Sequence, residues 1–151
     1  MITSENIRNF LTEKLKETDI FIVEIAVKPG NRIFVFLDSM NNINIDDCAR
    51  VNRLINQHFD RDVEDYALEV SSAGLTSPFK VEQQYIKHLG KKVKIKTIEG
   101  KIIKGVLTAY KDNTLFVSET IKINGKFQNN EYKLSLTEVL EMKLDISFLN
   151  I

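Results

Sequence analysis

The densest group of chemically active side chains in this sequence is a set of seven lysines between positions 87 and 104, opposed only by Glu99. On a strand, Lys92, Lys94 and Lys96 share one face while the alternate residues turn inward. Ammonium groups in such a row bind phosphates or an acidic protein surface, with little reading of base identity. The same pattern also fits a solvated strand face whose lysines discourage edge-to-edge pairing, and both interpretations stay open. The candidate anion-binding residues are Lys91, Lys92, Lys94, Lys96, Lys101 and Lys104.

Other residue types that carry chemistry are not arranged for catalysis. His58 and His88 lie in different halves, without a cysteine or carboxylate at metal-ligand spacing. Ser71 and Ser72 lack the glycine two residues earlier and the following helix that a nucleophile elbow requires, although a hydrolase at this turn stays as a distant alternative. We therefore expect no enzyme, no metal and no cofactor.

Asp46 and Asp47 are the one carboxylate pair that invites a metal or acid–base interpretation. Adjacent helical residues point about 100° apart, so the two side chains do not converge on one ligand. Their place in the first turn of a helix capped by Asn44 fits compensation of the helix dipole instead.

Composition indicates a soluble cytoplasmic protein. The 151 residues are 43% hydrophobic with one cysteine, Cys48, which fits a reducing compartment. The first residues show no signal-peptide pattern, and no apolar run approaches a membrane span. Charge is uneven: residues 1–80 have 9 Lys/Arg and 13 Asp/Glu (net −4), whereas residues 81–151 have 12 and 8 (net +4). The basic half is the one expected to meet a polyanion or an acidic surface.

The first half reads as α-β-β-α-β. An apolar stripe at helical spacing begins after Thr3 or Ser4, and β-branched runs at 20–28 and 32–38 flank Pro29-Gly30-Asn31 as a hairpin. The second helix then crosses over to a strand at 66–70, parallel to the one before. This order resembles part of a KH-type RNA-binding domain, but the Gly-x-x-Gly loop of that clamp is absent.

The second half reads as short strands after one short helix. Val81, Tyr85, Ile86 and Leu89 indicate the helix, closed by Gly90. Strand-like segments follow at 92–98, 101–110, 114–119, 121–127 (around the hairpin signal Asn124-Gly125) and 140–148, with a helical turn at 135–139. Gly105 marks a bend that lets a small sheet curl. The expected architecture is α+β: a three-stranded sheet with two helices in domain 1–80, then a small SH3-like or Sm-like barrel in domain 81–151, joined by a hinge near 75–84.

The segment between the halves has the most specific string. Leu68-Glu-Val-Ser-Ser-Ala-Gly-Leu75, followed by Pro78-Phe79, resembles the signature of the ribosome maturation factor RimP family, and the similar order of elements extends this resemblance over essentially the whole chain. Its motif residues are Leu68, Glu69, Val70, Ser71, Ser72, Gly74, Leu75 and Pro78. Ala73, Thr76 and Ser77 depart from the family pattern, which often has proline and then an acidic–basic pair. Gly74 is expected to supply a positive φ, and Leu75 and Phe79 are expected to pack.

The resemblance implies a non-enzymatic assembly factor that binds the maturing small ribosomal subunit. It also implies docking of the barrel with a ribosomal protein of the decoding region, number twelve of the small subunit. The acidic half is then expected to meet basic proteins and the lysines to meet rRNA. We expect a monomer without a small-molecule substrate or a membrane partner. The alternative is a stand-alone RNA chaperone of Sm type, which would form rings through an exposed barrel edge.

Overall fold

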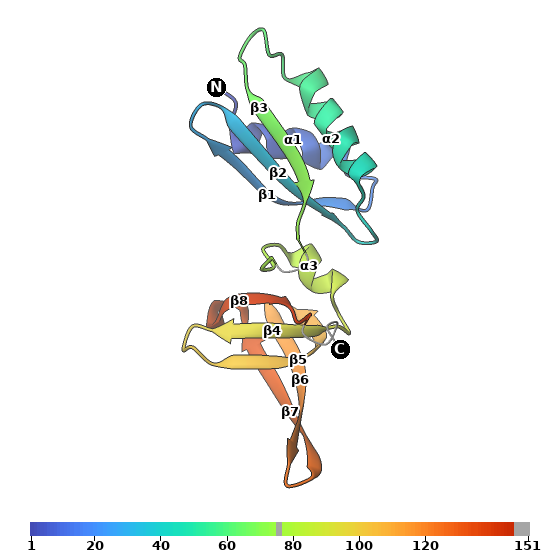
Figure 1. Cartoon of the computed structure of the whole chain (residues 1–151), viewed down its shortest axis with the longest axis vertical. Coiled ribbons are helices and arrows are strands. Elements are labelled where there is room, and N and C mark those ends of the chain that lie inside the picture. The colour runs from blue at the N-terminus through green and yellow to red at the C-terminus, as the bar shows by residue number, and fades with distance from the viewer. Residues whose placement is uncertain (75–76, 147–151) are drawn as a thin grey trace. The chain divides into compact units, whose positions relative to one another are not determined.

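The computed structural model describes residues 1–74 and 77–146. The chain divides into two compact units, Met1–Ala73 and Gly74–Ile151, and each has a hydrophobic core of its own. The fold is α+β, with both helices longer than two turns in the first unit and most strands in the second (Figure 1).

The first unit has the predicted α-β-β-α-β order. Its elements are α1 (Ser4–Lys14), β1 (Ile20–Lys28), β2 (Arg32–Ser39), α2 (Ile45–His58) and β3 (Ala67–Ser72). The sheet order is β1-β2-β3, with β1 antiparallel and β3 parallel to β2, as the crossover predicts. The hairpin turn between β1 and β2 contains Gly30 and Asn31, both at positive φ.

Both helices of this unit begin at reciprocal caps. The Thr3 hydroxyl accepts the Asn6 N–H (3.1 Å), and the Asn6 side chain accepts the Thr3 N–H (3.2 Å). In α2 the Asn44 side chain accepts the Asp47 N–H (2.9 Å), while the Asp47 carboxylate accepts the Asn44 N–H (3.1 Å). Asp47 is therefore a capping residue, which confirms the structural interpretation of the acidic pair.

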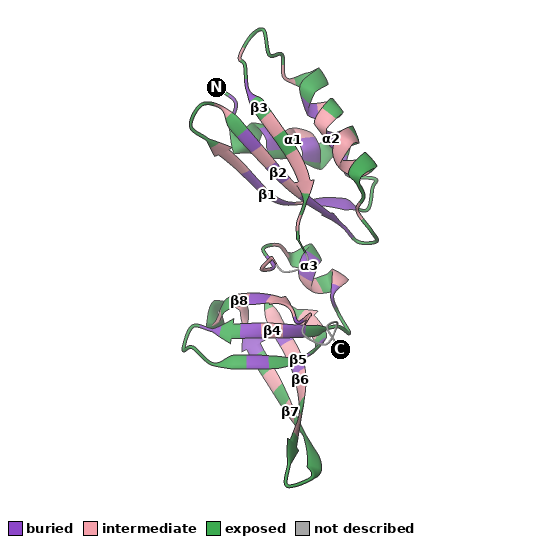
Figure 2. Ribbon diagram, in the orientation of Figure 1, coloured by how far each residue is buried: buried purple, intermediate pink, exposed green. Residues whose placement is uncertain are grey.

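The core of the first unit lies between one face of the sheet and the two helices. Ile7, Leu11, Val51 and Ile55 of the helices are fully buried together with Val35 and Leu37 of β2. Figure 2 shows the buried positions alternating with intermediate ones along β1 and β2, and with mostly exposed ones along the two helices. His58, at the end of α2, stacks on Phe10 with ring centroids 4.1 Å apart, so its role is in packing.

The second unit consists of a short helix and one antiparallel sheet. Its elements are α3 (Glu82–Lys87), β4 (Lys92–Thr97), β5 (Ile102–Lys111), β6 (Thr114–Ile123), β7 (Lys126–Ser135), the 3₁₀ turn η1 (Leu136–Glu138) and β8 (Val139–Leu144). The strand order is β7-β6-β5-β4-β8. Within residues 77–146 the outer strands β7 and β8 do not pair with each other, so the sheet is open and the predicted barrel closure is not confirmed.

Two strand boundaries differ from the prediction. The sequence pattern indicated a short hairpin at 121–127, whereas β6 runs unbroken to Ile123 and β7 continues from Lys126 to Ser135. The polar run after Phe127 has no apolar alternation, so periodicity could not reveal that it is a strand. The last strand ends at Leu144, earlier than expected, and Phe148 lies outside the described residues.

Gly105 permits a close approach of two strands. A Cβ atom at this position would lie 2.5 Å from the Ser118 carbonyl oxygen and 3.0 Å from a Val117 methyl group. Only glycine allows β5 to approach β6 this closely, whereas the bend predicted at this position stays a prediction. The core of the unit forms around it, from Val93, Ile95, Ile103, Leu107, Leu115 and Val117.

The short helix α3 is present, and Gly90 closes it at a φ of +83°. Its buried face is not the apolar one that the pattern indicated. Gln84 and His88 are 3% and 5% exposed, whereas Ile86 and Leu89 are 43% and 39% exposed. Specific hydrogen bonds and ring contacts, described below, select the polar residues for the interior.

Candidate nucleic-acid interface

The lysine cluster lies on the outer face of the second unit's sheet. Lys94, in β4, stands opposite Lys104 of β5 on one side and opposite Lys143 of β8 on the other. Directly opposed residues of antiparallel strands share a face, so three ammonium groups cross three adjacent strands in one row. We call Lys94, Lys104 and Lys143 the lysine row.

Two carboxylates border this row. Lys92 forms an ion pair with the buried Asp145 (3.8 Å), and Lys143 lies 3.3 Å from Glu141, which is also the register partner of Lys96. Lys94 and Lys104 are the members for which the described residues show no ion pair. The positive potential of the face is therefore highest around these two residues.

The remaining predicted lysines point elsewhere or precede the sheet. The Lys101 ammonium lies over the Tyr132 ring, 4.8 Å from its centroid, and does not join the row. Lys91 is exposed just before β4, where its carbonyl accepts the Leu107 N–H. The structure thus brings together Lys92, Lys94, Lys96 and Lys104 and adds Lys143.

Lys143 was missed because its neighbours are distant in sequence. A period-two pattern places it on a strand, but only the pairing of β8 with β4 puts it beside Lys94. The apolar part of this face was missed for the same reason: Ile102 and Val106, 44% and 37% exposed, stand opposite Lys96 and Lys92. The face is therefore a mixed surface of lysine and aliphatic side chains.

Edge protection does not explain these lysines. β4 lies between β5 and β8, so both of its edges are hydrogen-bonded, and the free edges of the described sheet belong to β7 and β8. The interpretation that lysines on this strand discourage edge-to-edge pairing is wrong. What remains is a solvated face or an anion-binding face.

Tyr85 and Tyr110, two aromatic residues of the second unit, stack on each other. The Tyr85 and Tyr110 rings lie 5.2 Å apart at 25°. Burial raises the pKa of the Tyr85 hydroxyl, and the neighbouring Tyr110 raises this pKa further. The Tyr110 hydroxyl donates to the Asn113 side chain (3.1 Å), so this pair is part of the unit's packing.

The serine-containing motif of the first unit is structural within the described residues. Leu68 and Val70 pack against the core, and Ser71 and Ser72 continue β3 opposite Phe36 and Leu37. The Ala73 N–H then donates to the Leu37 carbonyl (2.8 Å). Both serines thus lie in extended backbone paired with β2, not on the sharp turn that exposes a nucleophile.

The expectation for Gly74 is wrong, because Gly74 is not among the residues of positive φ. Among the described residues, a Cβ atom there would meet the Ser77 hydroxyl oxygen, at 3.3 Å. Leu75 and Thr76 lie outside the described residues, so the expected packing of Leu75 is not tested.

Phe79 anchors the start of the second unit, as expected. It is 9% exposed, its N–H donates to the Met142 carbonyl (2.7 Å), and its ring stacks on His88 at 4.7 Å. The His88 Nδ1 lies 2.6 Å from the Gln84 carbonyl oxygen, and the Gln84 side chain accepts the Val81 N–H (3.1 Å). These contacts explain why α3 buries polar residues, and they give His88 a structural role.

Over residues 1–74 and 77–146, no three His, Cys, Asp or Glu side chains gather as a metal site. No helix in those ranges has the length and apolar character to cross a bilayer.

The comparisons with known proteins agree on one family. The model of the RimP N-terminal domain matches residues 10–76. A protein of Porphyromonas gingivalis (strain ATCC BAA-308 / W83) is 48% identical over 85 residues, 56% of each chain, so this match spans just over half of that relative's length. A protein of Flavobacterium psychrophilum is 36% identical over 98 residues, 64% of each chain. A protein of Christiangramia forsetii is 30% identical over 145 residues, 91% of this chain and 95% of its own. All three are named ribosome maturation factor RimP, and the chain belongs to the RimP family.

Proposed function

We propose that this protein is a ribosome maturation factor, a cytoplasmic, non-enzymatic monomer that binds the maturing small ribosomal subunit. The observation that carries the proposal is the match to a ribosome maturation factor over nearly the whole length of both chains. The lysine row supports it, because three ammonium groups on one face suit the phosphates of rRNA.

The two units divide the contacts in this proposal. The second unit contacts rRNA through the lysine row and nearby Lys92 and Lys96, and it docks with the ribosomal protein of the decoding region. The first unit, residues 1–73, has 8 Lys/Arg and 13 Asp/Glu (net −5) and meets basic ribosomal protein surface. We also propose that the sheet of the second unit closes into an SH3-like barrel. In that barrel β7 and β8 would lie next to each other.

Co-sedimentation tests the function. The purified protein is spun with free small subunits, large subunits and joined ribosomes, at low and moderate salt. We expect it to pellet selectively with free small subunits, with a loss on raising salt that reports phosphate contacts. Pelleting with none of the particles, or equally with all three, contradicts the proposal.

A matched pair of variants tests the lysine row. The double variant Lys94→Glu/Lys104→Glu should weaken small-subunit binding and flatten its salt dependence. The control, Lys16→Glu/Lys111→Glu, makes the same charge change at exposed lysines outside the row and should bind as the unaltered protein does. If both double variants bind small subunits equally well, the lysine row does not contact rRNA.

The second candidate function is an Sm-type RNA chaperone, favoured by the edges of β7 and β8, which no strand of the described residues pairs with. Ring formation would join these edges between copies. Light scattering distinguishes the two candidates: a monomer supports the maturation factor, and a stable ring supports the chaperone.

A further inference from the structure

The strands β6 and β7 extend beyond the core of the second unit as a two-stranded arm, which we define as residues 119–131. Its paired residues run from Glu119 opposite Asn130 to Ile123 opposite Lys126 at the tip. The buried side chains of these strands stop at Val117 on β6 and Leu134 on β7. Figure 1 shows the arm projecting past the other strands of its unit, and Figure 2 shows it almost entirely exposed.

Local interactions hold the arm in shape without a core. Asn124 and Gly125 both have positive φ (51° and 79°), as a tight two-residue hairpin turn requires. The Thr120 hydroxyl donates to the Asn129 side chain across the strands (2.7 Å). A two-stranded ribbon without packing is marginal in water, so the arm is not explained by the stability of the fold.

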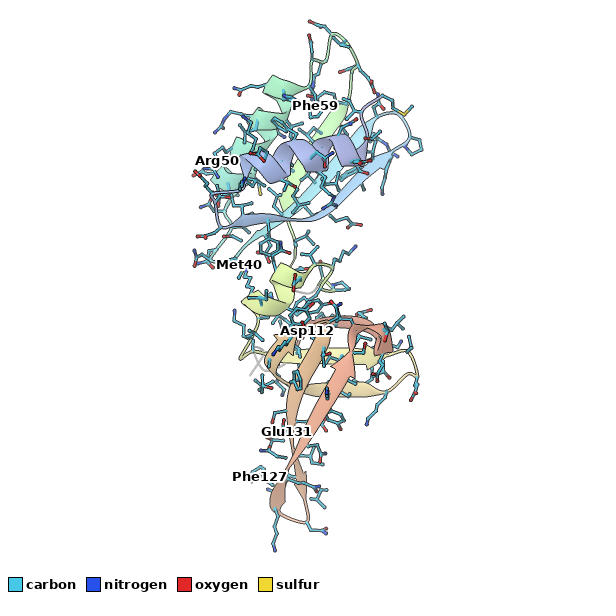
Figure 3. The ribbon with its side chains drawn as sticks, turned by 180° about the vertical axis from the view of Figure 1, so that it is seen from behind. Met40, Arg50, Phe59, Asp112, Phe127 and Glu131 are labelled. Atoms are coloured by element: carbon cyan, nitrogen blue, oxygen red, sulfur yellow. The ribbon has the colours of Figure 1, made fainter. Side chains whose placement is uncertain are left out.

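The arm exposes an aromatic ring beside a cation. Phe127, labelled near the tip in Figure 3, is 77% exposed. It stands opposite Lys122, whose ammonium lies 5.9 Å from the ring centroid. Lys126 is the other charge near the tip, and from Thr120 to Asn130 the arm has no carboxylate. Amide side chains fill most of the remaining positions on β7: Gln128, Asn129 and Asn130.

These features suit unpaired RNA. Aromatic rings stack on splayed bases, neighbouring lysines contact the backbone phosphates, and amides bond to base edges. We propose that the arm binds single-stranded nucleotides, with Phe127 stacked on a base and Lys122, on the same face of the arm, at a phosphate. The inference rests on the proposed function, to which it adds a site for unpaired rRNA separate from the lysine row.

The distribution of apolar residues on the arm argues against protein docking. Ile121 and Ile123 face the side opposite to Phe127, because adjacent strand residues alternate. The apolar side chains of the tip are therefore divided between two faces instead of forming the contiguous patch typical of a protein interface. The excess of positive charge at the tip points the same way, toward a polyanion.

A single tryptophan tests the stacking directly, because the chain contains none. In Phe127→Trp, a 12-nucleotide single-stranded RNA of mixed sequence should quench the fluorescence and protect it from acrylamide. The control is Val63→Trp at an 83% exposed position of the first unit, where fluorescence should not change. No quenching of Phe127→Trp by the RNA, or equal quenching of both variants, overturns the inference.

Affinity measurements separate the ring from the charges. Phe127→Leu keeps an apolar side chain and should weaken binding of the same RNA roughly 5- to 150-fold, the range for loss of one stacked base. Lys122→Gln should lower the slope of log K against log salt by about 0.7. Ile123→Ala, at the tip on the opposite face, should leave both quantities unchanged, and a Phe127→Leu effect no larger than that of Ile123→Ala contradicts stacking.

The outcomes distinguish this site from the proposed function. Selective pelleting of the unaltered protein with small subunits, combined with unchanged RNA affinity of Phe127→Leu, overturns the arm's role and leaves the maturation factor intact. If Phe127→Leu loses subunit binding but keeps its affinity for RNA, the arm docks on protein and the inference is wrong. RNA binding that depends on Phe127, without any pelleting with subunits, supports the arm and contradicts the ribosomal function.

Discussion

At the scale of single residues, two positions show how one group can fix the local structure: Gly105, through the absence of a side chain, and Glu64, through its carboxylate. Gly105 has no side chain because the Ser118 carbonyl occupies the space of a Cβ. Glu64 joins distant parts of the first unit, since its carboxylate accepts the Ile2 N–H (2.9 Å) and an Asn31 amide hydrogen (3.0 Å) and lies 3.1 Å from the Met1 ammonium. Both residues therefore give sharp tests of the structure.

Gly105→Ala should lower the free energy of unfolding of the second unit by about 1–3 kcal/mol, because the added methyl group forces β5 and β6 apart. Urea denaturation followed by circular dichroism measures it. Gly74→Ala is the control, since within the described residues its Cβ meets one side-chain hydroxyl, and the substitution should change stability by less than about 0.5 kcal/mol. A Gly105→Ala variant as stable as Gly74→Ala contradicts the close approach of the strands.

Glu64→Gln should make stability less dependent on acid pH. The Ile2 N–H and the Met1 ammonium hold the pKa of the Glu64 carboxyl below its usual value. A lowered folded-state pKa stabilises the protein above the unfolded-state pKa of about 4.3, and this contribution disappears as pH falls through the lower folded pKa. Melting temperatures are measured between pH 7 and pH 3. The unaltered protein should melt at a higher temperature than Glu64→Gln at neutral pH, and this difference should shrink as the pH falls. Glu13→Gln, at an exposed position of α1, is the control. A difference in melting temperature between the unaltered protein and Glu64→Gln that grows in acid contradicts the lowered pKa of Glu64.

At the scale of elements, β4 has two conflicting properties. Its inward residues Val93 and Ile95 are fully buried, while Lys94 on its outer face has lysines opposite it on both neighbouring strands. Like charges directly opposed across strands are destabilising. A fold selected for stability alone would avoid this arrangement, which supports a binding role for the row.

Lys94→Gln should therefore raise the free energy of unfolding by about 0.2–1 kcal/mol while weakening small-subunit binding. Thermal denaturation at low salt measures the first effect, and co-sedimentation measures the second. The comparison is Lys92→Gln, which removes the ion pair with buried Asp145 and should lower stability. If Lys94→Gln is destabilising, the row is not under electrostatic strain.

At the scale of the whole molecule, the chain carries two separate cores. The core around Leu11 includes residues from Ile2 to Val70, and the core around Leu107 includes residues from Phe79 to Leu144, with no shared member. Their net charges also differ in sign, negative in the first unit and positive in the second. Stability is then a property of each unit.

Leu107→Ala should destabilise the second unit by about 2–5 kcal/mol and leave the first unit's stability nearly unchanged. Hydrogen exchange measured by mass spectrometry should show faster exchange in β4–β8 alone, and Leu11→Ala should show faster exchange in β1–β3 and the helices of the first unit alone. Faster exchange throughout the chain in either variant contradicts independent cores.

Much of the secondary structure of this protein could be predicted from its sequence, because it depends on local interactions. Caps at Thr3 and Asn44, the turns at Gly30 and Asn124-Gly125 and the parallel β3 follow from side-chain hydrogen bonding, positive φ and crossover handedness. The string from Leu68 to Leu75, followed by Pro78-Phe79, and the order of elements around it indicated the RimP family. The caps and turns need only neighbouring residues, and the parallel direction of β3 follows from the general handedness of crossover connections.

Only the tertiary structure decided what depends on pairing between distant segments. β4 became an inner strand because β8 returns to it, and this placed Lys143 beside Lys94 while Lys101 turned to Tyr132. Gln84 and His88 replaced Ile86 and Leu89 in the interior because their polar atoms find partners there, as does the His88 ring against Phe79. The arm extends through a polar sequence because cross-strand hydrogen bonds, which leave no periodic apolar pattern, hold β7 to β6. The periodic pattern of apolar residues predicts which side chains face a core, but it does not predict which strands pair with each other.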